Sequence, residues 1–200
     1  MSEPSPRLRR AAGPPPDKTR LRQAALDHLA RYAATEAGVR RILERRVARW
    51  ARAAEAEGQD RAMIAAVQAS SAEQIAAIAR SLTEVGAVND GAFAESRVRR
   101  LARAGRSRRA IAAHLAAKGV QPDIAAAALP DGEDAELDAA LAFCRRRRLG
   151  PFAREAEEGA ARLKALGAFA RGGFSQAIAR KVLAMDPAEA EDRLLASRQG

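Results

Sequence analysis

The chain has 200 residues, of which 48% are apolar, and its formal net charge is +10 at pH 7. About half of the apolar residues are alanines, which bury little area each, so small helical units are favoured over a deep enzyme core. The single cysteine, Cys144, excludes an internal disulfide, which fits a reducing cytosol. Without a run of about 18 apolar residues or an apolar signal segment, we expect a cytoplasmic protein with no membrane partner.

Residues 1–16 are rich in proline, serine and arginine, a composition typical of a disordered basic arm. The remainder shows helical spacing of its apolar residues, with Ser, Thr, Asp or Asn at helix starts and Gly or Pro at helix ends. Residues 59–71 are interpreted as a link between two helices, and nothing indicates a strand. The predicted helices are 17–32, 36–58, 72–86, 90–105, 108–119, 122–129, 134–149, 152–170, a ninth from 176 and a short tenth from 187.

An internal repeat is visible in the second half of the chain. Gly119 aligns with Gly173, and the same offset, near fifty residues, relates Ile124 to Ile178. A repeat of this length predicts an all-α fold in which three tandem three-helix repeats form an elongated array. The expected divisions are an arm at 1–16, repeats at 17–88, 89–130 and 131–185, and a short C-terminal helix or tail at 186–200.

We find no catalytic or metal-binding constellation in the sequence. A phosphate-binding loop, a dinucleotide turn and a His–Glu metal pair are all absent, and two histidines with one cysteine are too few for a zinc site. Cys144 lies on an apolar helix stripe and is interpreted as a small buried hydrophobe, and His114 as a structural histidine. We therefore expect no enzyme activity, cofactor or metal.

Basic residues are unusually dense between residues 96 and 118, where eight cations occur without a single acid. Three arginines are expected on one face of the helix over 90–105. Two more are expected in the first turn of the next helix, where the helix dipole disfavours cations, so without a local partner they indicate an external anion. The candidate contact residues are Arg99, Arg103, Arg106, Arg108 and Arg109.

A second candidate surface comprises Arg41, Arg45 and Arg49 on the predicted helix over 36–58. For the run at 145–148 a local and a functional interpretation both stay open, because cations are favoured at a helix C-terminus in any case. The few aromatic residues fall mostly on apolar stripes and form no base-stacking platform. Contact with nucleic acid would therefore be made to phosphates, independently of sequence.

The residues around this basic region resemble the middle repeat of the RecX family of recombination regulators. That repeat begins with Asp-Asp-x-x-Phe-Ala, as at Asn89–Ala94, and continues with a Gly-Lys/Arg-Ser/Gly-x-x-Arg/Lys-Ile run, as at Gly105–Ile111. A Leu-x-x-x-Gly-Val/Ile segment follows, as at Leu115–Val120. The resemblance extends over roughly residues 20–185 and is strongest over 82–130.

The resemblance implies a cytoplasmic, monomeric, non-enzymatic modulator of the RecA recombinase. Members of the family lie along the groove of the RecA–single-stranded-DNA filament and mainly inhibit its ATPase, recombinase and co-protease activities. Asn89 replaces the family's first aspartate and Ala110 replaces its arginine or lysine, which leaves open which basic residues make the contacts. The alternative function is a basic helical protein that binds DNA or RNA on its own, without regard to sequence.

Overall fold

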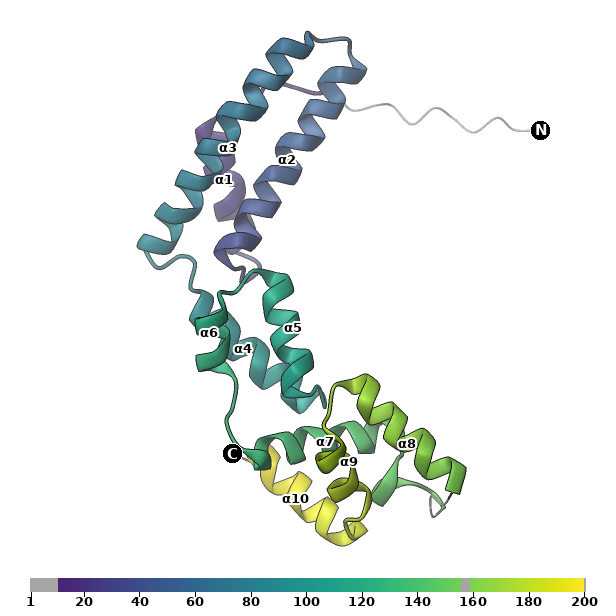
Figure 1. Cartoon of the computed structure of the whole chain (residues 1–200). Helices are drawn as coiled ribbons and strands as arrows, with labels where there is room; N and C mark the ends of the chain where they lie inside the picture. Colours follow the sequence, from purple (N-terminus) through teal and green to yellow (C-terminus); the bar gives the residue numbers. More distant parts are fainter. Residues whose placement is uncertain (1–10, 156–158, 200) are drawn as a thin grey trace, which may run out of the picture. The chain divides into compact units, whose positions relative to one another are not determined.

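The computed structural model describes residues 11–155 and 159–199 (Figure 1). The chain divides into two compact units, residues 1–89 and 90–200. In the described parts of the chain, every regular element is a helix, and no strand is present. The predicted all-α class with tandem three-helix repeats is therefore confirmed.

The first unit consists of α1 (Lys18–Leu29), α2 (Glu36–Ala56) and α3 (Arg61–Glu84). The predicted caps Asp17 and Thr35 accept hydrogen bonds from the backbone N–H groups of Arg20 at 2.8 Å and Gly38 at 2.9 Å. Apolar residues from all three helices form the core of this unit: Leu21, Ala25, Val39, Leu43, Val47, Ile75, Ile78, Ala79, Leu82 and Val88.

The link predicted over residues 59–71 is wrong, because most of that segment is the first half of α3. Asp60 caps the helix by accepting the backbone N–H groups of Ala62 and Met63. The segment has few large apolar residues, yet alanine is the strongest helix former. Ile64 is buried with Trp50 in a second apolar cluster, so this half of α3 packs on α2.

By length and composition alone, α3 is apolar enough to cross a membrane. It is still no unbroken run of apolar residues, because Gln68, Glu73 and Arg80 interrupt it. Ile75, Ile78 and Leu82 of α3 are nevertheless buried against α1 and α2, as in the core helix of a three-helix bundle. This packing accounts for the large apolar residues of the helix, whereas most of its alanines are exposed.

The second unit begins with α4 (Asp90–Arg103), α5 (Arg108–Lys118) and α6 (Pro122–Ala128), which share one apolar cluster. A second cluster is built by α7 (Glu133–Arg147), α8 (Gly159–Gly172), α9 (Gln176–Leu183) and α10 (Pro187–Gln199). Helix α8 starts later than predicted. The chain leaves α7 through Arg148 in the left-handed region, at φ 55°, and forms a 3₁₀ turn, η1 (Gly150–Phe152).

Two terminal segments differ from their expected forms. Helix α10 has 13 residues, and its Ala190 and Leu194 are buried in the last core, so it is an integral part of this helical group. Residues 11–16 lie against α2, where Trp50 Nε1 donates to the Gly13 carbonyl at 3.2 Å. The first ten residues of the expected arm lie outside the described residues. The remaining division boundaries stay a prediction.

The turns at Gly119 and Gly173, which the internal repeat places at equivalent positions, have the same structure. Gly119 and Gly173 adopt φ of 81° and 84°. The next residue in each turn donates its N–H to the carbonyl five positions earlier, Val120 to Leu115 and Phe174 to Phe169, both at 3.1 Å. A left-handed glycine with this bond is a standard helix C-cap. The two glycines aligned by the internal repeat are therefore structurally equivalent.

The α4–α5 and α8–α9 turns meet at the Ser107 side chain. The buried Ser107 hydroxyl donates to the Gly172 carbonyl at 2.7 Å and accepts the Ala110 N–H at 3.1 Å. A Cβ on Gly173 would lie 2.7 Å from the Ser107 oxygen, and a Cβ on Gly105 would lie 2.5 Å from the Phe143 nitrogen. We call this contact region, formed by Gly105, Ser107, Phe143, Gly172 and Gly173, the glycine junction.

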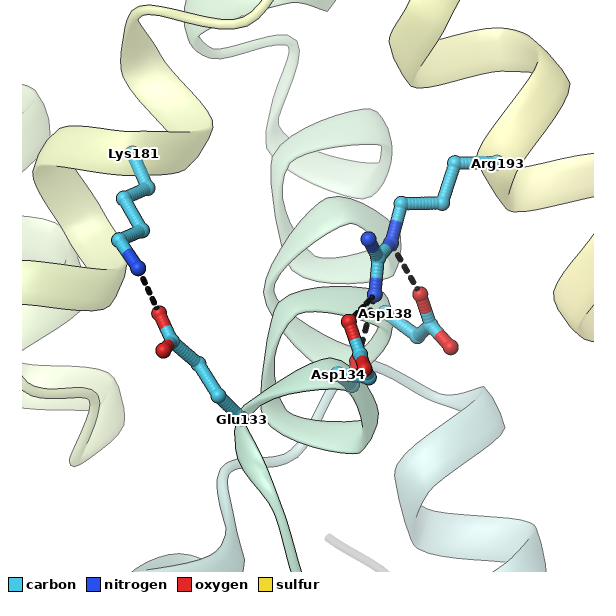
Figure 2. A network of polar contacts seen from close by, with 5 residues as sticks. All are labelled: Glu133, Asp134, Asp138, Lys181 and Arg193. Carbon is cyan, nitrogen blue, oxygen red and sulfur yellow. Dashed lines mark hydrogen bonds and ion pairs between the residues drawn. The ribbon is translucent and has the colours of Figure 1, made fainter.

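Ion pairs connect α7 to α9 and α10 (Figure 2). Arg193 of α10 reaches Asp138 at 2.7 Å and Asp134 at 2.8 Å, and Lys181 of α9 pairs with Glu133. The hydrogen bond that Arg193 donates to Asp134 is the main reason why the pKa of Arg193 is raised, so the guanidinium stays charged. The network fixes the position of α10 against α7.

Replacing Arg193 with alanine is expected to lower the free energy of unfolding of the second unit by about 1 kcal/mol, because a partly buried, doubly paired arginine is lost. Urea denaturation followed by circular dichroism measures this change. Arg180→Ala is the matched control, since Arg180 is exposed on α9 and pairs with no described acid. An equal loss in both variants would mean that the network contributes nothing.

Candidate nucleic-acid and protein interface

The α4 part of the candidate surface has the predicted spacing. Arg99 and Arg103 are exposed one turn apart, and Arg99 makes only a loose pair with Glu95, at 3.6 Å, in which both side chains are about 60% exposed. Such a pair contributes little stability. Arg106 is not on this helix face, because α4 ends at Arg103 and Gly105 turns the chain at φ 70°.

The expectation that the arginines at the start of α5 have no local partner is wrong for Arg108. Its Nη1 pairs with Asp131 at 2.9 Å and also donates to the Pro130 carbonyl, while its backbone N–H donates to Glu136 at 2.9 Å. These acids offset the unfavourable helix dipole. Arg109, also exposed, has no ion pair among the described residues.

A basic cluster made of residues far apart in the sequence lies beside the glycine junction. Arg106, Arg146 and Arg147 line a small pocket of about 80 Å³ together with Gly105, Phe143 and Gly172. The Arg147 guanidinium stacks 4.8 Å from the Phe143 ring, and Arg146 donates to the Ala104 carbonyl. These contacts hold Arg146 and Arg147, and together with Arg106 they surround one hollow that no described carboxylate lines.

The run at 145–148 therefore divides by role. Arg145 pairs with Glu191 at 2.8 Å and lies over the Phe152 ring, so its contacts are local. Arg148 is the left-handed C-cap of α7. Only Arg146 and Arg147 join the cluster. A sequence signal was present in the charge run itself, but nothing in the sequence alone placed two of its members beside Arg106.

His114 reports the positive potential of this region. Its pKa is lowered, first by partial burial and then by Lys118, Arg97 and Arg106. Cations of α4, of the turn after it and of the end of α5 therefore all contribute positive potential at His114. The histidine is neutral at pH 7, and the surrounding field favours an anion.

The lowered pKa predicts a pH effect on stability. Below pH 6.5, the usual histidine pKa, the unfolded chain binds a proton at His114, whereas the folded chain binds it only at lower pH. The free energy of unfolding therefore falls as the pH drops from 6.5 toward the folded pKa. Denaturation of the full chain at pH 7 and pH 5.5 should show this loss. His114→Gln should reduce the pH dependence, and an unchanged pH dependence would contradict the assignment.

The second candidate surface lies on α2 in the first unit. Arg45 and Arg49 are exposed one turn apart, and Arg41 is half-buried. Arg49 also lines a large pocket beside Trp50.

Cys144 is fully buried in the last core, as predicted. In the described residues, no group of three or more His, Cys, Asp and Glu side chains could hold a metal ion.

Comparison with known proteins assigns this chain to a family. A family model for the second three-helix domain of RecX matches residues 89–129, which contain most of the α4–α5 surface. Regulatory protein RecX of Myxococcus xanthus (strain DK1622) is 38% identical over 175 residues, which is 85% of this chain and 87% of the relative. The chain belongs to the RecX family. The predicted resemblance is thereby confirmed.

Two further relatives agree with this assignment. Regulatory protein RecX of Agrobacterium fabrum (strain C58) is 44% identical over 110 residues, covering 55% of this chain and 59% of the relative. The crystal structure of RecX from Lactobacillus salivarius has a TM-score of 0.58 at 19% identity, covering 83% of this chain and 94% of that one. At this identity the crystal structure supports the RecX fold alone.

Proposed function

We propose that this RecX-family protein binds the RecA–single-stranded-DNA filament and mainly inhibits its ATPase, recombinase and co-protease activities. The observation that carries the proposal is the exposed arginine surface of α4, α5 and the intervening turn, which coincides with the domain that the family model matches. On this proposal the protein acts as a cytoplasmic monomer without catalysis or a cofactor.

The surface chemistry suits a partner that contains both protein and DNA. Arginine pairs in a bidentate way with carboxylates and with phosphates. Arg103 and Asp138 lie on a groove of about 250 Å³ whose other lining is mostly alanine, with Leu194, and apolar walls of this kind favour protein contact. The basic cluster, by contrast, presents cations alone, which favours a phosphate.

Titration of the DNA-dependent ATPase of RecA tests the proposal. Inhibition well below one protein per RecA monomer is expected, because a regulator of filament growth acts on many protomers. Inhibition that begins only when the protein covers the DNA would instead indicate simple competition for phosphates. In that case direct binding to single strands should weaken with salt at a log–log slope of about −0.7 per phosphate contacted.

A further inference from the structure

The first unit contains a pocket that the candidate surface on α2 does not explain. Its volume is about 560 Å³, and it lies between residues 11–16 and the helices α1 and α2. Three arginines line it with two prolines and the only tryptophan of the chain. These residues are Pro14, Pro16, Arg20, Arg46, Arg49 and Trp50.

The wall contributed by residues 11–16 is held in place by long-range contacts. Trp50 Nε1 donates to the Gly13 carbonyl at 3.2 Å, and the Ala12 N–H donates to the Glu57 carboxylate at 2.6 Å. Ala12 also packs on the apolar cluster that contains Trp50 and Ile64. The pocket is therefore built from tertiary contacts and not from a single helix face.

The charge of the lining has one sign. Arg46 and Arg49 are exposed, and neither forms an ion pair with a described residue. Arg20 has a partner, Asp17 at 3.7 Å, but that pair is about half exposed and loose. No described carboxylate lines the pocket. Three guanidinium groups around one space favour an anion such as a phosphate.

The rest of the pocket lining is apolar and favours an apolar part of the ligand. The prolines, two alanines of the N-terminal segment and Trp50, which is only 6% exposed, form an apolar wall next to the arginines. A volume of about 560 Å³ is within the range for small-molecule sites. We propose that this pocket binds a nucleoside phosphate, with its phosphate on Arg46 and Arg49 and its base against the prolines, beside the small exposed part of Trp50.

The ligand can come from two sources, a nucleotide within single-stranded DNA or a free nucleotide. Trp50 is the only tryptophan, so its fluorescence reports on this pocket alone. The full chain is titrated with an oligothymidylate, with thymidine monophosphate and with pyrophosphate. We expect a saturable change in Trp50 emission with at least one of the two thymidine ligands, and weaker binding of pyrophosphate.

Replacing Arg46 and Arg49 together with alanine should weaken binding at least about tenfold, because each removes a charge-assisted hydrogen bond. Alanine preserves the helix, which circular dichroism verifies. Arg52→Ala is the matched control, since Arg52 is exposed on the same helix but does not line the pocket. Its affinity should stay within about twofold of the unchanged protein.

Saturation by the oligothymidylate alone would identify strand DNA as the source, and saturation by the monophosphate would identify a free nucleotide; both support the proposal. Three results would overturn it: no saturable change with either thymidine ligand, pyrophosphate binding as tightly as they do, or an equal loss of affinity in Arg52→Ala. RecA is absent from these titrations, so their failure is separate from failure of the proposed function.

Discussion

Replacing Gly105 with alanine is expected to lower the free energy of unfolding of the second unit by about 3 kcal/mol or more. The left-handed φ of 70° costs about 1–3 kcal/mol for a residue with a Cβ. The new Cβ would also lie 2.5 Å and 2.8 Å from the nitrogen and Cα of Phe143, which are backbone atoms that cannot rotate away. Forced repacking adds about 1–3 kcal/mol.

Gly86→Ala separates these two causes. Gly86 has nearly the same φ, 72°, but nothing lies within 4 Å of a Cβ built there. Its replacement should cost only the conformational part, about 1–3 kcal/mol. Urea denaturation followed by circular dichroism measures both variants. If both variants lost the same stability, the close packing of the glycine junction would have no energetic role.

Replacing Arg103, Arg106 and Arg109 together with alanine is expected to weaken binding to the RecA filament by about 100-fold, with unchanged helicity. A hydrogen bond to a charged group contributes about 1.5–3 kcal/mol, and two such losses already account for this factor. All three side chains are exposed, so the core is untouched. Inhibition of the DNA-dependent ATPase gives the apparent affinity.

The control carries the same loss of charge at another place. Arg31, Arg61 and Arg80 are exposed in the first unit, belong to neither candidate surface and line no described pocket. Their triple alanine variant should inhibit RecA as well as the unchanged protein does. Equal weakening in the two triple variants would show that net charge, and not this surface, governs the interaction.

The sequence predicted the helix boundaries best where a residue has a conformational reason to end or start a helix. Ser107 and Ser175 cap helices as expected, and Gly119 and Gly173 end them in left-handed turns. Prediction failed over the first half of α3, where alanines replace the usual large apolar stripe and only Asp60 marks the start.

The sequence predicted which arginines belong to the candidate site, but not which residues they contact in the fold. The density of arginines near α4 and α5 was evident from the sequence, but the partner of Arg108 lies 23 residues away at Asp131. Likewise, Arg106 joins Arg146 and Arg147 only because the glycine junction brings two turns of the chain together. Helical periodicity describes neighbours within one helix and carries no information about such distant pairs.

The glycine junction also bears on which ligands the second unit can distinguish. It joins Arg106 to Arg146 and Arg147 through main-chain contacts that leave no space for a methyl group. The separation between the backbone segments that carry these arginines is thus fixed by close packing, whereas the guanidinium groups lie at the ends of long side chains. If the basic cluster binds an anion, the junction limits how far apart its three cations can lie.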